Sequence, residues 1–170
     1  MKTYMKNIVV TIVFALISAE DAIAGDSTKF ANAIQKGNIP LAVIYAKPLA
    51  ENGDVDAQIV AGTLLVQGDR GVEKDVKSGI HFLEMCIENP KATDAQKGGC
   101  YWNLTFPYFG GESGIPADMD LVIKYVWRAA RLGHEKAIDQ LTESVCKNRG
   151  SNCPNVLQQR LAQCTDPCLK

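Results

Sequence analysis

Two stretches of this sequence match each other: Gly68-Asp-Arg-Gly71-Val72-Glu-Lys-Asp75 and, 43 residues further on, Gly111-Glu-Ser-Gly114-Ile115-Pro-Ala-Asp118. Both carry glycine at the first and fourth positions, a β-branched residue at the fifth and aspartate at the eighth. Glycine adopts the left-handed backbone of tight turns without steric cost, and aspartate is a favoured helix N-cap. Each stretch therefore predicts a turn followed by a helix, and the fixed distance between them indicates a repeat.

Amphipathic helices are expected on both sides of each turn. The helix from Asp75 buries Val76, Ile80, Leu83 and Ile87, at spacings of four, three and four residues. The helix from Asp118 carries Val122, Tyr125, Val126, Ala129 and Leu132 and ends at Gly133, and the helix from Asp54 to Gly68 carries Ala57, Ala61, Leu64 and Leu65. No alternating apolar pattern indicates a strand, so the fold class is all-α. Because neither helix pair can bury its apolar stripe alone, we expect a short α/α superhelix, a solenoid of antiparallel helix pairs.

Further helices are expected before, between and after these pairs. The first begins near Asp26 or Ser27, carries Phe30, Ala33 and Ile34 and stops at Gly37; the second starts at Asn38 and carries Leu41, Ile44, Tyr45 and Leu49, with Pro48 kinking or ending it. A capping box from Thr93 to Gln96 opens a helix that runs through Cys100 to about Thr105, where Pro107 and Gly110-Gly111 close it. After Gly133 the helical pattern continues with Ala137, Ile138, Leu141 and Val145.

The N-terminus indicates export. Lys2 and Lys6 precede an apolar run over residues 8–19, and Ala22-Ile-Ala24 follows, so we expect a signal peptide over residues 1–24. Glu20 and Asp21 end the run too early for a membrane anchor, and no second span is expected. Residues 25–170 suit one domain, beginning with an N-terminal helix pair over 25–53. A net charge of −1 favours neither nucleic acid nor an anionic membrane as partner.

All six cysteines follow the expected signal peptide. Export would deliver them to an oxidising compartment, where thiols pair into disulfides. They are Cys86, Cys100, Cys146, Cys153, Cys164 and Cys168. We expect three disulfides, with the pairing Cys86–Cys100, Cys146–Cys153 and Cys164–Cys168; a rival pairing joins Cys146 to Cys164 and Cys153 to Cys168. Either would make residues 141–170, with a last helix from Pro154 to about Gln163, a cysteine-rich, disulfide-stapled C-terminal cap.

The chain resembles the Sel-one-like repeat family, relatives of the tetratricopeptide repeats. The resemblance rests on Pro48-Leu-Ala-Glu-Asn-Gly-Asp54, Ala57-Gln58, Gly62, the two turns, Ala129-Ala-Arg-Leu-Gly133 and Ala137, and it places two such repeats in residues 54–140. It implies a right-handed superhelix whose inner face binds proteins. Three positions depart from the pattern: Gly79 and Val122 stand where the family often has alanine, and Thr105 replaces a small glycine.

No constellation of catalytic residues emerges. His81 and His134 are interpreted as surface or capping side chains, Ser113 as a turn residue, and Asp54, Asp75 and Asp118 as helix caps. The sequence Asn103-Leu-Thr105 matches a glycosylation acceptor, a common chance match. The expected site contains no metal and no cofactor, and we expect no enzymatic activity; a β-lactam-binding enzyme, implied by some cysteine-rich family members, is the least favoured alternative.

Aromatic residues cluster before the second turn, and at least one should face outward. The expected partner-binding residues are Tyr101, Trp102, Tyr108 and Phe109, with Phe106 beside them. The leading hypothesis is a periplasmic adaptor, or an immunity protein that occludes a delivered toxin, whose partner is another protein such as a toxin or a secretion component. The alternative is a secreted virulence or host-interaction factor.

Overall fold

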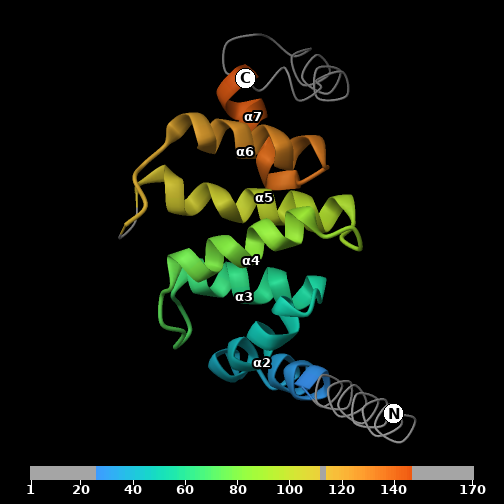
Figure 1. Ribbon diagram of the computed structural model, residues 1–170. Coiled ribbons are helices and arrows are strands. Elements are labelled where there is room, and N and C mark those ends of the chain that lie inside the picture. The colour runs from blue at the N-terminus through green and yellow to red at the C-terminus, as the bar shows by residue number, and fades with distance from the viewer. Residues whose placement is uncertain (1–25, 112–113, 147–170) are drawn as a thin grey trace, which may run out of the picture.

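The helices of this protein form one continuous stack (Figure 1). The computed structural model describes residues 26–111 and 114–146. A first helix covers residues 26–35, and it is followed by α2 (Ile39–Glu51), α3 (Val55–Gln67), α4 (Val76–Glu88), α5 (Asp94–Phe109), α6 (Met119–Arg131) and α7 (Glu135–Cys146). From α2 onward each helix packs on the next, and α3 also contacts α5. Within the described residues there is no β-strand, and the fold is the all-α solenoid of helix pairs predicted from the sequence.

The paired glycines of the two matching turns share one backbone conformation. Gly68 and Gly71 have φ angles of 65° and 82°, and Gly111 and Gly114 have φ angles of 70° and 80°. All four lie in the left-handed region, where a side chain would be strained. The glycines that define the sequence repeat are therefore required by the turn itself.

Each turn is also closed by an equivalent hydrogen bond. The backbone N–H of Asp75 donates to the carbonyl of Leu65 over 3.0 Å, and that of Asp118 donates to the carbonyl of Tyr108 over 2.9 Å. Both aspartates then cap the next helix, as predicted, by accepting from a backbone N–H three residues on. Asp75 accepts in addition from the Ser78 hydroxyl, and these hydrogen bonds hold the pKa of its carboxyl below the usual value. The shift of 43 residues is thus a structural repeat.

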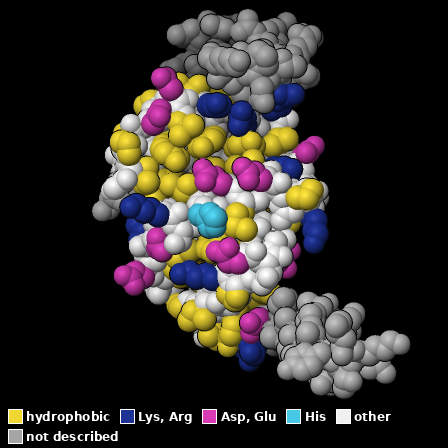
Figure 2. Space-filling model, in the orientation of Figure 1, with side chains coloured by type: hydrophobic (Ala, Val, Ile, Leu, Met, Phe, Trp, Pro, Cys, Tyr) yellow, Lys and Arg dark blue, Asp and Glu magenta, His cyan; other side chains and the backbone are white. Residues whose placement is uncertain are grey.

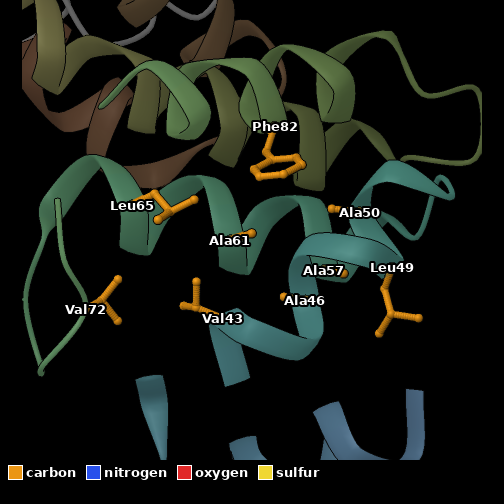
Figure 3. Packing of buried hydrophobic residues seen from close by; sticks show 9 residues of the cluster. All are labelled: Val43, Ala46, Leu49, Ala50, Ala57, Ala61, Leu65, Val72 and Phe82. Carbon is orange, nitrogen blue, oxygen red and sulfur yellow. The ribbon is translucent and has the colours of Figure 1, made fainter. Parts of the chain in front are cut away.

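Small side chains dominate the contact between α2 and α3 (Figure 3). The cluster consists of Val43, Ala46, Leu49, Ala50, Ala57, Ala61, Leu65, Val72 and Phe82, and Phe82 covers α3 from α4. The stripe predicted for the second helix is therefore wrong in part: Leu49 is buried, but Ile44 is 62% exposed and Ala42, Val43, Ala46 and Ala50 take the core positions. Ile34 of the first helix is exposed as well.

Two glycines, Gly62 on α3 and Gly79 on α4, let these helices approach closely in the first repeat. A Cβ atom added to Gly62 would lie 2.7 Å from the Leu83 side chain and 3.1 Å from the Gly79 carbonyl oxygen. One added to Gly79 would lie 2.8 Å from the Val66 nitrogen and 2.9 Å from the Gly62 carbonyl oxygen. Because these neighbours are backbone atoms that cannot rotate away, Gly79 lets the two helices meet.

A buried pair of amides links three helices, which the sequence analysis did not predict. Gln58 on α3 donates through Nε2 to the carbonyl of Ala50 on α2 over 3.0 Å, and its Oε1 accepts from Asn89 Nδ2, 3.1 Å away, at the end of α4. The same Asn89 nitrogen donates to the carbonyl of Gly53. Buried amides are tolerated when they are hydrogen-bonded, and this pair fixes α2, α3 and α4 in one register.

The helix caps agree with the sequence predictions, whereas the helix ends expected near the prolines do not. Asn38, Asp54 and Thr93 act as N-caps, and the capping box between Thr93 and Gln96 is present. However, α5 ends at Phe109, with Pro107 inside it, instead of near Thr105, and α2 likewise continues three residues beyond Pro48. Proline removes one hydrogen bond from a helix, and one near the C-terminal end is tolerated where packing holds the last turn together.

The disulfide Cys86–Cys100 is present, as predicted, and joins the end of α4 to α5 with a Cα–Cα separation of 6.5 Å. Both residues are fully buried. The remaining predictions concern residues outside the described ranges: the signal peptide over 1–24, the role of Ser113, the last helix, and the pairing of Cys146, Cys153, Cys164 and Cys168, since the structure describes only the backbone of Cys146.

Candidate protein-binding surface

The aromatic residues of α5 divide between two sides of the helix. Tyr101 and Tyr108 turn towards α6, where their ring centroids lie 5.9 Å and 6.0 Å from that of Tyr125. The Arg128 guanidinium lies 5.5 Å from the centroid of the Tyr101 ring. Burial, together with nearby tyrosines and Glu84, raises the pKa of Tyr125 to about 12. Tyr101 and Tyr108 are therefore partly buried side chains that pack towards α6, and their expected role in partner binding stays a prediction.

Trp102 and Phe106 lie on a different side of α5. The Trp102 ring meets Phe106 edge to face at 5.9 Å and stacks on His134 at 5.2 Å. Trp102 is half-buried, whereas Phe106 is 45% exposed, and Phe109 is more exposed still. Phe106 and Phe109 are thus the exposed aromatic side chains of α5, and the Trp102 ring contacts Phe106.

Polar side chains also form hydrogen bonds between α3 and α5. Asn103 Nδ2 donates to Thr63 Oγ1 over 3.0 Å, and Gln96 Nε2 donates to Asp56 Oδ1 over 2.9 Å. A Cβ atom added to Gly99 would meet no atom within 4 Å, so the space above it is open. We call the surface made by Val60, Thr63, Gly99, Asn103 and Phe106 the α3–α5 face; helical spacing places these residues on one side of the two helices.

A second apolar surface lies at the other end of the stack, between α2 and the turn after α3. It is a groove of about 310 Å³ lined by Pro40, Val43, Ile44, Lys47, Leu65, Gly71, Val72 and Glu73. The exposed Ile44 forms part of it. This groove could not be predicted from the sequence, because an apolar, β-branched residue such as Ile44 has the same pattern whether it lines a groove or lies in the core.

His134 lies between α6 and α7, next to the Trp102 ring. Its backbone carbonyl accepts from the N–H groups of Ala137 and Ile138, so it begins α7 as a capping residue. Among the described residues its Nδ1 is buried without a hydrogen-bond partner. Burial lowers the pKa of His134 below its ordinary 6.5, and Lys136 lowers it further, against a smaller opposing effect of Glu135.

This pKa shift makes the stability of the fold depend on pH. In the unfolded chain His134 has its ordinary pKa of 6.5, and in the folded chain its pKa is lower. At a pH between these two values the unfolded chain binds a proton at His134 and the folded chain does not. The free energy of unfolding therefore falls as the pH drops below 6.5. We expect a His134→Phe variant, which keeps a ring against Trp102, to lose this part of the pH dependence. Urea unfolding from pH 7.5 to pH 5 measures it; equal slopes for both proteins would contradict it.

Residues with catalytic potential are not assembled into a site. His81 is exposed and lies 3.8 Å from Glu51, and Asp54, Asp75 and Asp118 serve as caps. Asn103, the residue of the glycosylation-acceptor match, donates a hydrogen bond from its side chain to Thr63. Within residues 26–111 and 114–146 no group of three or more His, Cys, Asp or Glu side chains could hold a metal ion, and no helix is long and apolar enough to cross a membrane.

One sequence feature bears on the enzymatic alternative. Ser144-Val-Cys-Lys147 matches the Ser-x-x-Lys spacing of β-lactam-binding serine enzymes. It begins in the last turn of α7, and the side chains of its residues lie outside those that the structure describes. The spacing alone does not make a nucleophile, because a base and an oxyanion site must converge on the serine.

Comparisons with known proteins add nothing to these observations: no family model matches the chain, and neither the curated proteins nor the solved structures gave a match. The resemblance to Sel-one-like repeats therefore rests on the sequence motifs and stays a prediction.

Proposed function

We propose that this chain is an exported protein that acts by binding another protein, as a periplasmic adaptor or as an immunity protein that occludes a delivered toxin. The observation that carries the proposal is the exposed Phe106 on the α3–α5 face, with the Trp102 ring in edge-to-face contact with it. Aromatic side chains held rigidly at a surface are favoured anchors of protein interfaces. The resemblance to Sel-one-like repeats, whose inner face binds proteins, also supports a protein-binding function.

The composition of the α3–α5 face fits a protein partner better than a small molecule. Besides Phe106, the α3–α5 face contains the aliphatic Val60, a glycine with open space above it, and the Asn103–Thr63 pair. An apolar centre with hydrogen-bonding groups at its edge is the usual composition of an interface. A partner could rest an apolar side chain over Gly99 and form hydrogen bonds with the amide and hydroxyl beside it.

Export is supported by the disulfide Cys86–Cys100 and by the signal-like residues 1–24. Disulfides persist in oxidising compartments and are rare in the cytosol. We propose the periplasm as the compartment, with secretion into the medium as the alternative.

Affinity capture with tagged residues 25–170 from periplasmic and culture fractions tests the proposal. We expect one partner whose purified form binds saturably, and we expect Phe106→Ala to weaken binding by about tenfold or more, as truncation of an aromatic anchor does. Trp102→Ala should weaken it too, but Phe106 is the cleaner test because its removal leaves the core intact. The fraction that yields the partner distinguishes a periplasmic role from a host-facing one.

The matched control is Ile44→Ala, which alters the groove at the other end and should leave binding unchanged. If Ile44→Ala abolished binding and Phe106→Ala did not, the groove would be the binding site. If no fraction yielded a saturable partner, the binding function itself would be wrong.

A further inference from the structure

Three large hydrophobic side chains near the C-terminal end of the stack are exposed, although their counterparts in the first repeat are buried. Phe109, Met119 and Ile123 are 63%, 50% and 52% exposed. Shifted by 43 residues, the first repeat has Val66, Val76 and Ile80 at these positions, and they are only 3%, 8% and 8% exposed. Hydrophobic side chains also gather over α5 and α6 in Figure 2. The second repeat therefore leaves uncovered the surface that the first repeat buries.

The first repeat buries this surface under the next helix pair. Val66, Val76 and Ile80 belong to a cluster with Cys100 and Leu104 of α5, against which Tyr108, Ile115 and Tyr125 pack. These covering residues come from α5, from the turn after it and from α6. A complete cover therefore needs two helices and the turn between them.

For the second repeat, α7 supplies only the first part of such a cover. From α5 to α7 the shift is 37 residues, so that Ala137 and Leu141 correspond to Cys100 and Leu104. Ala137 and Leu141 are both buried against α6. The counterpart of Tyr108 is then residue 145, at the end of α7. The counterparts of the turn and of the second covering helix fall beyond α7, within residues 147–170.

We propose that residues 147–170 of this chain dock on the surface formed by Phe109, Met119 and Ile123 and complete the cover. The segment begins where α7 ends and is slightly longer than residues 110–131, which cover the first repeat. It contains Val156, Leu157 and Leu161, whose spacing suits one face of a helix. A second copy of the chain would have to imitate this arrangement, whereas the segment continues it directly. The inference does not depend on the proposed protein partner.

Trypsin cleavage after Arg160 reports whether the segment is docked, because a protease cuts the undocked state. The full oxidised chain is digested briefly, reduced, and the fragment ending at Arg160 is quantified by mass spectrometry. We expect Ile123→Glu to speed this cleavage by about tenfold or more, because a charge replaces an apolar contact. Ile44→Glu, at an exposed isoleucine on α2, should leave the cleavage rate unchanged.

Circular dichroism and the Cys86–Cys100 disulfide establish that each variant is folded, and Met119→Glu replaces Ile123→Glu if the latter is not. Equal cleavage at Arg160 in the wild-type chain and in the folded variant would overturn the proposal. If cleavage stayed equal while a wild-type dimer dissociated on substitution, the surface would belong to a second copy, and the proposal would again be wrong. Faster cleavage in both the Ile123 and Ile44 variants would show general loosening and would also overturn it.

Discussion

Replacing Gly79 by valine should destabilise the fold by about 3 kcal/mol, at the upper end of the usual cost of overpacking a core. The reason is the crossing of α3 and α4, where even a first carbon atom on Gly79 would lie within 3 Å of two backbone atoms. A rotamer change cannot relieve such a contact, so the helices must separate, and the Leu83 side chain and its neighbours lose packing. Urea unfolding of the purified protein measures the change.

Gly99→Val is the matched control, since Gly99 also lies inside a helix but has open space around it. Its stability should stay within about 0.5 kcal/mol of the wild type. A comparable loss at both glycines would mean that helix propensity, and not close packing, sets the cost. Gly62→Val should fall between the two, because the nearest atoms belong to the Leu83 side chain, which can move.

Removing the disulfide between α4 and α5 is the second change with a large effect. A Cys86→Ala/Cys100→Val variant should lose about 3 kcal/mol, the loss expected when a loop of this length is no longer closed in the unfolded chain. The valine restores part of the sulfur volume, so that the loss of the cross-link dominates over the cavity. We expect the thermal midpoint to fall by about 10 °C.

The variant must be measured without reductant, so that any disulfides among the other four cysteines stay intact. Reductant should then bring the wild-type chain down to the midpoint of the variant or below it. An unchanged midpoint in the double variant would show that the cross-link adds no stability, and that packing alone joins the two helix pairs.

Turns, caps and the cross-link could be predicted from the sequence because each depends on local chemistry. Aspartate before an apolar stripe and paired glycines in a turn act over a few residues, and the two bridged cysteines are only 14 residues apart on consecutive helices. The α2 stripe could not be predicted in this way. Large residues such as Ile44 carry the strongest apolar signal, but closely packed helices bury the small residues between them, as Ala46 and Ala50 show.

The candidate site was predicted in part. The prediction that an aromatic side chain faces outward is confirmed, but the exposed ones are Phe106 and Phe109, while Tyr101 and Tyr108 pack against α6. The geometry with which α5 and α6 cross decides which side of α5 is covered. This geometry cannot be predicted from the sequence of α5 alone. The amide pair Gln58 and Asn89 was missed for the same reason, because its two members come from different helices.

The covalent link between α4 and α5 also bears on how the protein responds to mechanical force. In a stack where each unit touches only its neighbours, tension on the two ends peels helices off one by one. The disulfide between Cys86 and Cys100 transmits the tension directly from one helix to the next. The residues between these two cysteines are therefore not stretched, from whichever end the unfolding starts. A pulled molecule should therefore stretch to a contour length that is short by this loop, and reductant should release the missing length.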